Sequence, residues 1–250
     1  IATNEDVSSP TVTFTSGGDA ANNADTVSGS SPGTSFTSAY TINASDTDGT
    51  VAISVTATDV AGNTTSGFTT ISAGSVTVDQ TAPASQKTQG VVTTGGDNQV
   101  AGYWNSGNTG VDITVQIADD SSINGGTVQL LVSTDGGGSF VSLDSPSTIS
   151  AVNTTKTISV AGAVLEGVTG FGESDVLQFK ATITDTSGNA TTGTVSDTTL
   201  TVDQTAATIS TSSIASDNST VTLAKTGDTV TLTIATNEDV SSPTVTFTSG

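Results

Sequence analysis

Apolar and polar residues alternate one by one in many short runs along the chain. The clearest runs are residues 51–57 (VAISVTA) and residues 111–117 (VDITVQI). Because successive side chains of a β-strand point to opposite faces, this period of two predicts strands with one buried face and one solvated face. We expect a helix only at residues 163–171, as one or two turns. The same alternation predicts further strands around Val12 and Phe14; Phe36, Tyr40 and Ile42; Val76 and Val78; Val128, Leu130 and Val132; Phe140, Val141 and Leu143; Ile158 and Val160; Phe179, Ala181 and Ile183; Leu200 and Val202; Val221 and Leu223; and Val230, Leu232 and Ile234.

The residue composition supports the same fold class. Threonine, serine, valine and glycine dominate, whereas leucine, glutamate and lysine, which favour helices, are scarce. β-Branched residues suit pleated strands, and glycine, asparagine, aspartate and serine suit the turns between them. A chain this polar and acidic could also be disordered, but its apolar residues are ordered by period rather than scattered. We therefore predict an all-β protein.

The sequence repeats itself over a long interval. Residues 1–17 and residues 234–250 both read IATNEDVSSPTVTFTSG, without a single difference and at an offset of 233 residues. Such a repeat predicts that the chain spans slightly more than one period of a tandem array. We also expect Ile1, which starts in mid-pattern, not to be a natural N-terminus.

A weaker repeat lies within that period. The segment VTVDQTAP at 76–83 recurs as LTVDQTAA at 200–207, and a similar hairpin precedes each copy, at 54–65 and at 180–192. One period therefore holds two related domains, and the length of each suits a sandwich of about seven strands.

This register divides the chain into three units. Residues 83–206 form a complete domain. Residues 1–82 form the later part of the other domain, whose opening strands are missing, and residues 207–250 begin its next copy. A sandwich without its opening strands exposes core and strand edges, so a self-contained, compact fold of residues 1–82 would contradict this register.

The charge and the missing residue types exclude most chemistries. The chain carries 24 acidic residues and four lysines, with a formal net charge of −20, and it has no histidine, cysteine or arginine. Imidazole and thiolate catalysis, thiolate or histidine metal sites, and binding of nucleic acid are therefore excluded. No apolar run is long enough to insert into a membrane. We predict no enzymatic activity and no small-molecule substrate, and we expect Trp104 to pack inside its domain rather than to stack on a sugar.

Several short motifs carry a family resemblance. Asp-x-x-Gly-Asn stands between two strands at residues 59–63 and 185–189, the sequence TVDQTAP follows the first copy, and GYWNSGNTGVDITVQIADDSS occupies residues 102–122. In this order the motifs resemble the bacterial immunoglobulin-like repeats that build the stalks of giant, type 1-secreted extracellular adhesins of the RTX and Bap-like kind. The resemblance covers essentially the whole chain. It implies tandem immunoglobulin-like β-sandwich domains in an extended repeat array, a stalk role outside the cell, and bound calcium.

The acidic residues are predicted to gather at the junctions between domains. In an immunoglobulin-like sandwich the chain enters at one pole, where the loop after the second strand and the last hairpin also lie. Three acidic segments would meet at the first junction, bringing Asp79 together with Asp119, Asp120 and Asp185. Oxygen ligands without nitrogen or sulfur suit calcium. The other interpretation is that these residues are aspartates favoured by turns.

The second junction repeats this pattern with Asp203, Glu238 and Asp239, and with the hairpin represented in this chain by Asp59. The segment SDTDG at 45–49 lacks the remaining ligands of an EF-hand loop. Its Asp46 and Asp48 either join a calcium site with Asp79 or form a tight turn.

The predicted role is mechanical. We expect a stalk or spacer repeat of a very long protein at the cell surface, with calcium stiffening the junctions rather than folding the sandwiches. Its partners would be the neighbouring repeats of the same polypeptide. The alternative is a self-assembling filament, sheath or surface layer in which chains also associate laterally. A carbohydrate-binding or enzymatic module would need an aromatic platform or a carboxylate cleft, and the sequence suggests neither.

Overall fold

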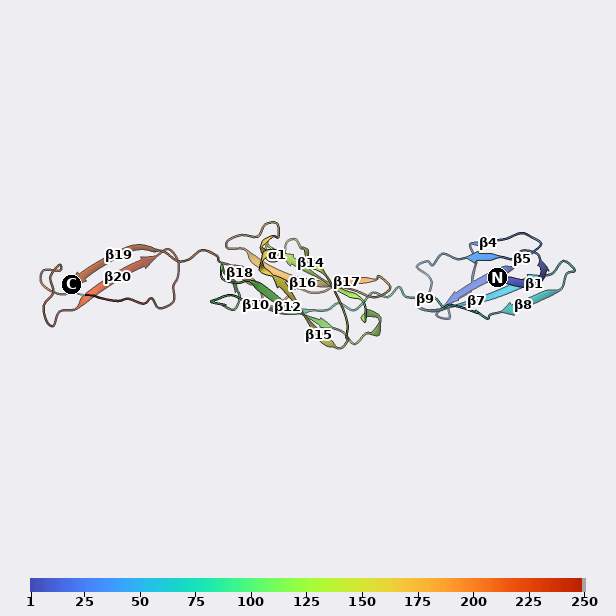
Figure 1. The fold of residues 1–250 in the computed structure, drawn as a ribbon, viewed down its shortest axis with the longest axis horizontal. Helices are drawn as coiled ribbons and strands as arrows, with labels where there is room; N and C mark the ends of the chain where they lie inside the picture. The colour runs from blue at the N-terminus through green and yellow to red at the C-terminus, as the bar shows by residue number, and fades with distance from the viewer. Residues whose placement is uncertain (249–250) are drawn as a thin grey trace.

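The computed structural model describes residues 1–248, and they form three β-structured parts in a row along the long axis of the molecule (Figure 1). We call these parts the N-terminal module (residues 1–82), the central domain (83–206) and the C-terminal segment (207–248); residues 249 and 250 of the third predicted unit lie outside the described residues. The all-β prediction is confirmed. The strands are β1 (Ala2–Val7), β2 (Thr11–Ser16), β3 (Asn22–Asn23), β4 (Thr26–Ser28), β5 (Gly33–Ser35), β6 (Thr37–Ala39), β7 (Gly49–Thr58), β8 (Thr64–Phe68), β9 (Thr77–Val78), β10 (Thr88–Thr94), β11 (Tyr103–Trp104), β12 (Gly110–Ile117), β13 (Thr127–Ser133), β14 (Val141–Thr148), β15 (Thr154–Ala161), β16 (Val176–Thr184), β17 (Ala190–Thr192), β18 (Leu200–Val202), β19 (Ile209–Ser216) and β20 (Val230–Thr236).

The central domain is built from two sheets that enclose a large apolar core. One sheet has the strand order β10-β12-β15, and the other has the order β11-β18-β16-β13-β14, with β17 paired to β16. Twenty buried apolar side chains lie in this core, including Ile113, Phe179 and the fully buried Trp104. The alternation in β12 and β16 places every second residue in the core, as the period of two requires. Burial of Trp104 confirms its predicted packing.

Two short helices accompany this domain. The 3₁₀-helix η1 spans Ser121–Ile123, and the α-helix α1 spans Gly162–Glu166. The helix predicted at 163–171 is therefore present but shorter than expected. It ends at Gly167, whose backbone N–H bonds back to the carbonyl groups of Ala163 and Leu165.

The N-terminal module has a small core. Its main sheet has the order β3-β2-β7-β8 with β9 on β7, and β1-β5 and β4-β6 form two further pairs. Only five apolar side chains of residues 1–82 are buried among those described: Val7, Val12, Phe36, Val55 and Val78. The same module leaves large side chains such as Phe68 and Ile71 exposed. Whether its missing strands lie in the preceding repeat stays a prediction.

The C-terminal segment is a single hairpin of β19 and β20. The strand predicted around Val221 and Leu223 is wrong, since both residues lie in the connection between β19 and β20 and are exposed. Strand β19 was not predicted, because its sequence ISTSSIAS shows little alternation. Pairing of its backbone with β20, which was predicted, forms the strand in spite of the weak pattern.

Candidate functional site

The candidate site is the linker that joins the N-terminal module to the central domain. The linker begins at Asp79, directly after β9, and continues with Gln80 and Thr81. On the side of the N-terminal module, the backbone N–H of Gln80 donates to Asp48 Oδ1 at 2.6 Å, and the hydroxyl of Thr81 donates to Asp48 Oδ2. The Thr81 hydroxyl is the main cause that lowers the pKa of Asp48. Asp48 therefore binds the linker directly.

The side chain of Gln80 strengthens the same attachment. Its amide Nε2 donates to the backbone carbonyl of Asp46 at 2.8 Å and to that of Asn43 at 3.2 Å. The buried carboxylate of Asp46 accepts hydrogen bonds from Asn22, from Tyr40 and from the backbone N–H of Asn43. Partial burial and the bond to Asp46 raise the pKa of Tyr40. Asp46 thus stabilises the loop that holds Gln80.

On the other side of the linker lies the turn of residues 185–189. Oδ1 of the buried Asp185 accepts three backbone N–H groups, from Ser187 at 2.9 Å, Gly188 at 2.7 Å and Asn189 at 2.9 Å. Gly188 has a φ of +101°, a conformation that favours glycine. The turn at residues 59–63 repeats this arrangement around Asp59 and Gly62, which has a φ of +94°. The Asp-x-x-Gly-Asn motif is therefore a hydrogen-bonded turn in both places.

Asp79 contacts this turn. Its carboxylate accepts a hydrogen bond from the hydroxyl of Ser187 at 2.8 Å, and its backbone carbonyl accepts one from the amide of Asn189 at 3.0 Å. The same amide donates to Asp185 Oδ2 at 3.0 Å, so Asn189 bridges the two aspartates. Hydrogen bonds of the turn therefore tie the linker to the central domain.

The loop of residues 118–124 lies beside the same turn. The backbone carbonyl of Ser122 accepts bonds from both the N–H and the hydroxyl of Thr186, each at 3.2 Å. Asp120 caps η1 by accepting from the N–H and the hydroxyl of Ser122. Asp119 is exposed. The three acidic segments predicted to meet at the first junction are thus neighbours in the structure.

The arrangement was also compared with what a calcium ion requires. The side chains supply only oxygen ligands, which suits a hard cation. Within residues 1–248, however, no three acidic side chains stand close enough together to hold a metal ion. The carboxylates of Asp79, Asp120 and Asp185 instead accept hydrogen bonds from N–H and O–H groups. The described geometry therefore does not itself form a calcium site, and calcium binding stays a prediction.

The second linker repeats the attachment of the first with different partners. The backbone N–H of Gln204 donates to Glu173 Oε2 at 2.9 Å, and its side-chain amide donates to Glu166 Oε1 at 2.8 Å. Glu166 also accepts the indole N–H of Trp104 at 3.1 Å. In both linkers the glutamine after the aspartate is therefore bound through its backbone and its side chain to the preceding part of the chain. We call this arrangement the glutamine clamp.

The other acids predicted for the second junction are not joined in the described residues. Asp203 follows β18, while Glu238 and Asp239 follow β20, and no hydrogen bond links the carboxylate of Asp203 to either in the part of the chain described. Asp59 lies in the N-terminal module, where the amide of Asn63 is the main cause that lowers the pKa of its carboxyl group. Sequence reasoning missed Gln80, Gln204, Glu166 and Glu173. The repeated TVDQTA segment was the available signal for the two glutamines.

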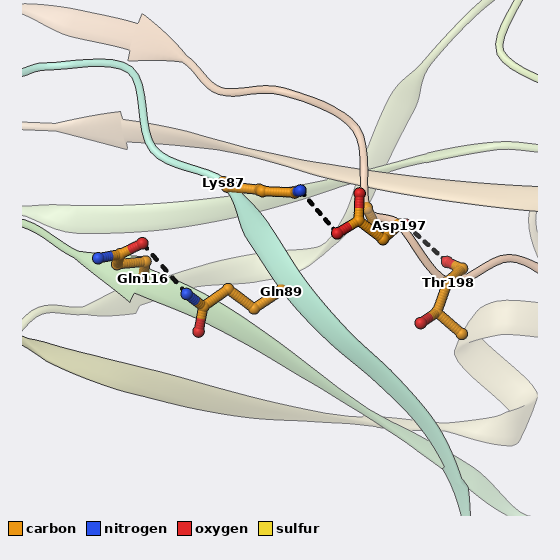
Figure 2. A network of polar contacts seen from close by, with 6 residues as sticks. Lys87, Gln89, Gln116, Asp197 and Thr198 are labelled. Atoms are coloured by element: carbon orange, nitrogen blue, oxygen red, sulfur yellow. Dashed lines mark hydrogen bonds and ion pairs between the residues drawn. The ribbon is translucent and has the colours of Figure 1, made fainter.

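The chain enters the central domain through a set of surface contacts (Figure 2). Lys87 Nζ lies 2.6 Å from Asp197 Oδ2, and Gln89 donates to Gln116 across β10 and β12 at 3.1 Å. The backbone N–H of Thr194 donates to the carbonyl of Gln86. The ion pair is largely exposed and adds little stability, so the backbone pairing carries most of this attachment.

Comparison with known proteins gives only distant similarities. No protein-family model matches the sequence, and no curated protein matches it. Among solved structures, a tetra-tandem repeat in the extending region of a large adhesion protein is 18% identical with a TM-score of 0.30, and it aligns with 91% of this chain and 55% of its own. The FN1–FN3 domains of chicken CNTN1 are 12% identical with a TM-score of 0.28, over 86% of this chain and 63% of that one. This chain thus spans less than two thirds of either structure. No helix in the described residues has the length and apolar character needed to cross a bilayer.

Proposed function

We propose that this chain is a structural spacer, a stalk repeat of a very long protein at the cell surface, and that it has no enzymatic activity. Three features support this role. The sequence is a tandem repeat, its parts are arranged in a row, and the linkers between them are short. A repeat array whose units contact mainly their neighbours gains length with each added unit. The partners in this role are the neighbouring repeats of the same polypeptide.

The glutamine clamp is the observation that carries the proposal. A spacer transmits force and keeps its reach only if its linkers resist bending. Gln80 and Gln204 each hold a linker through two hydrogen bonds, and the first linker is also bound by Asp48 and Ser187. Such a bonded linker restricts the angle between domains without a large apolar interface, whereas a free polar linker behaves as a flexible coil.

Small-angle scattering of the whole chain tests this proposal. The variant Gln80→Ala with Gln204→Ala removes both side-chain bonds and should shift the distribution of maximum dimensions to shorter and broader values. The variant Gln89→Ala is the control, because Gln89 bonds to Gln116 within the central domain and far from either linker. Equal scattering curves for the double variant and the unmodified chain would refute a role of the clamps in stiffness.

The alternative function is a subunit of a self-assembling extracellular filament, sheath or surface layer. One observation favours it. The C-terminal hairpin exposes an apolar face, with Ile209 and Ile214 both more than half accessible. Exposed apolar patches mark surfaces of association. Electron microscopy of the native material distinguishes isolated threads from an ordered lattice.

A further inference from the structure

One sequence occurs in this structure in two different environments. Residues 1–15 and residues 234–248 are identical. Val7 is 5% exposed, but its counterpart Val240 is 42% exposed; Val12 is 3% exposed, but its counterpart Val245 is 44% exposed. Because the sequences are the same, the difference comes from what surrounds them. The first copy packs against residues 18–82, and the second copy has no such partner within the described residues.

The hairpin before the second copy also has an uncovered apolar face. Ile214 in β19 lies directly opposite Leu232 in β20, so their side chains share one face. Val230 and Ile234 lie on that face too, because they are two residues from Leu232 along the strand. Ile214 is 65% exposed. This face, which we call the donor face, has the composition of a sandwich interior but covers nothing.

The backbone of this strand is able to pair on both edges. In the N-terminal module Ile1 exchanges two hydrogen bonds with Phe36, at 2.8 and 2.9 Å. In the hairpin, the carbonyl of Thr229 and the N–H of Asn237 both bond to β19. Since backbone groups alternate in direction along a strand, the even-numbered Ile234 points its N–H and C=O away from β19. Ile234 is the counterpart of Ile1, so one strand can pair with β19 on one edge and with β5 on the other.

The donor face would then lie inside the module. Ile1 and Phe36 are a hydrogen-bonded pair, so their side chains lie on the same face, and Phe36 is buried in the core of the N-terminal module. Ile234 in the position of Ile1 therefore directs its side chain to that core. Ile214 and Leu232, which share the face of Ile234, follow it.

We propose that the C-terminal segment of one copy of this chain completes the N-terminal module of a second copy, with residues 234–248 taking the place of residues 1–15. The incoming and outgoing segments have the same sequence and make the same contacts, so these cancel. The net gain is burial of the donor face, which drives the exchange. The two regions lie at opposite ends of the chain with the central domain between them (Figure 1). Association is therefore head-to-tail and open, which generates filaments. This inference goes beyond the spacer role and does not depend on it.

Sedimentation velocity of the full chain over a wide range of concentration tests the exchange. The chain should form dimers and longer oligomers as its concentration rises. The variant Ile214→Asp with Leu232→Asp places two charges on the donor face and should stay monomeric. The matched control, Thr231→Asp with Thr233→Asp, places the same charges on the opposite face of the same hairpin and should associate like the unmodified chain. An unmodified chain that stays monomeric, or two variants that associate equally, overturns the proposal.

A mixing experiment tests the direction of the contact. The variant Phe36→Asp with Val55→Asp disrupts the module that receives the segment, but leaves its own donor face intact. Alone, this variant and the donor-face variant should each be monomeric; mixed, they should form a one-to-one dimer that does not grow. Retention of the unfolding transition of the central domain in both variants shows that they remain folded there. Absence of the mixed dimer, or growth beyond it, contradicts head-to-tail exchange.

Discussion

At the scale of single residues, aspartates determine the turns of this chain. Asp185, Asp59 and Asp135 each accept several hydrogen bonds from a turn of about five residues. Such side chains replace the backbone partners that a strand would supply. In a chain with a formal charge of −20, much of the acidity therefore has a local structural use.

We expect removal of the Asp185 carboxylate to destabilise the central domain. Asp185→Ala leaves three backbone N–H groups without their acceptor in a buried turn, so the free energy of unfolding should fall by about 2–3 kcal/mol. Urea denaturation measures the change. Asp119→Ala is the control, because Asp119 is exposed, and its effect should be below about 0.5 kcal/mol. Equal stability of the two variants would show that the turn does not need its acceptor.

Acid should weaken the turn at residues 133–139. The hydroxyl of Ser133 is the main cause that lowers the pKa of Asp135, and the N–H of Ser139 adds to it. A carboxyl group whose pKa is lower in the folded state stabilises that state above its ordinary pKa, and this contribution is lost as the pH falls through the folded value. The stability of the unmodified chain should therefore exceed that of Asp135→Asn at neutral pH, and the two should converge in strong acid. A difference that is constant with pH would contradict this assignment.

At the scale of the elements, alternation alone does not decide which strands are stable. Strands β12 and β16 lie within sheets that face a second sheet, so their apolar residues are buried. The hairpin of β19 and β20 has the same kind of pattern in β20 but no opposing sheet in the described chain. Its apolar side chains therefore add little to the stability of a single copy.

The same substitution should thus have opposite consequences in two strands. Ile113→Ala in β12 empties a fully buried position and should lower the stability of the central domain by about 2–5 kcal/mol. Ile214→Ala in β19 should change the unfolding of a dilute chain by less than about 0.5 kcal/mol. Thermal and urea unfolding of both variants provide the measurement. A large loss of stability in dilute Ile214→Ala would mean that the hairpin already packs against its own chain.

At the scale of the whole molecule, the main question is what fixes the angles between its parts. The glutamine clamps act at both linkers with hydrogen bonds alone. Calcium binding by the neighbouring acids would add to this stiffness, because an ion bound by several loops ties them together. The two mechanisms are separable, since only the second depends on the ion.

We predict that calcium stiffens the rod without being needed to fold the domains. Small-angle scattering should give a narrower distribution of dimensions with calcium than with chelator, while the unfolding of the central domain, which has its own core, should stay the same. Asp79→Ala should abolish the calcium effect, and Asp112→Ala, on β12 away from the linker, should preserve it. If chelator leaves the dimensions unchanged, the acids at the junction serve the turns alone.

The sequence by itself determined the class of fold and much of its local structure. Residues 110–117 and 176–184 alternate so regularly that they fit only a half-buried strand, and the repeated Asp-x-x-Gly-Asn motif marks the turns. It also directed attention to the first junction, where Asp79 and the turn of Asp185 do meet. These inferences depend on neighbours along the chain, so a sequence contains them directly.

Tertiary structure alone decided the rest. Gln204 meets Glu166 and Glu173 across 38 and 31 residues, and nothing in the local pattern selects those two glutamates. Strand β19 forms because its backbone finds β20, although its side chains alternate poorly, and Val221 and Leu223 fall in a connection for want of a partner strand. Val12 and Val245 have identical local sequences but different burial. Hydrogen bonds and burial between distant segments depend on where those segments lie in space, which local sequence does not specify.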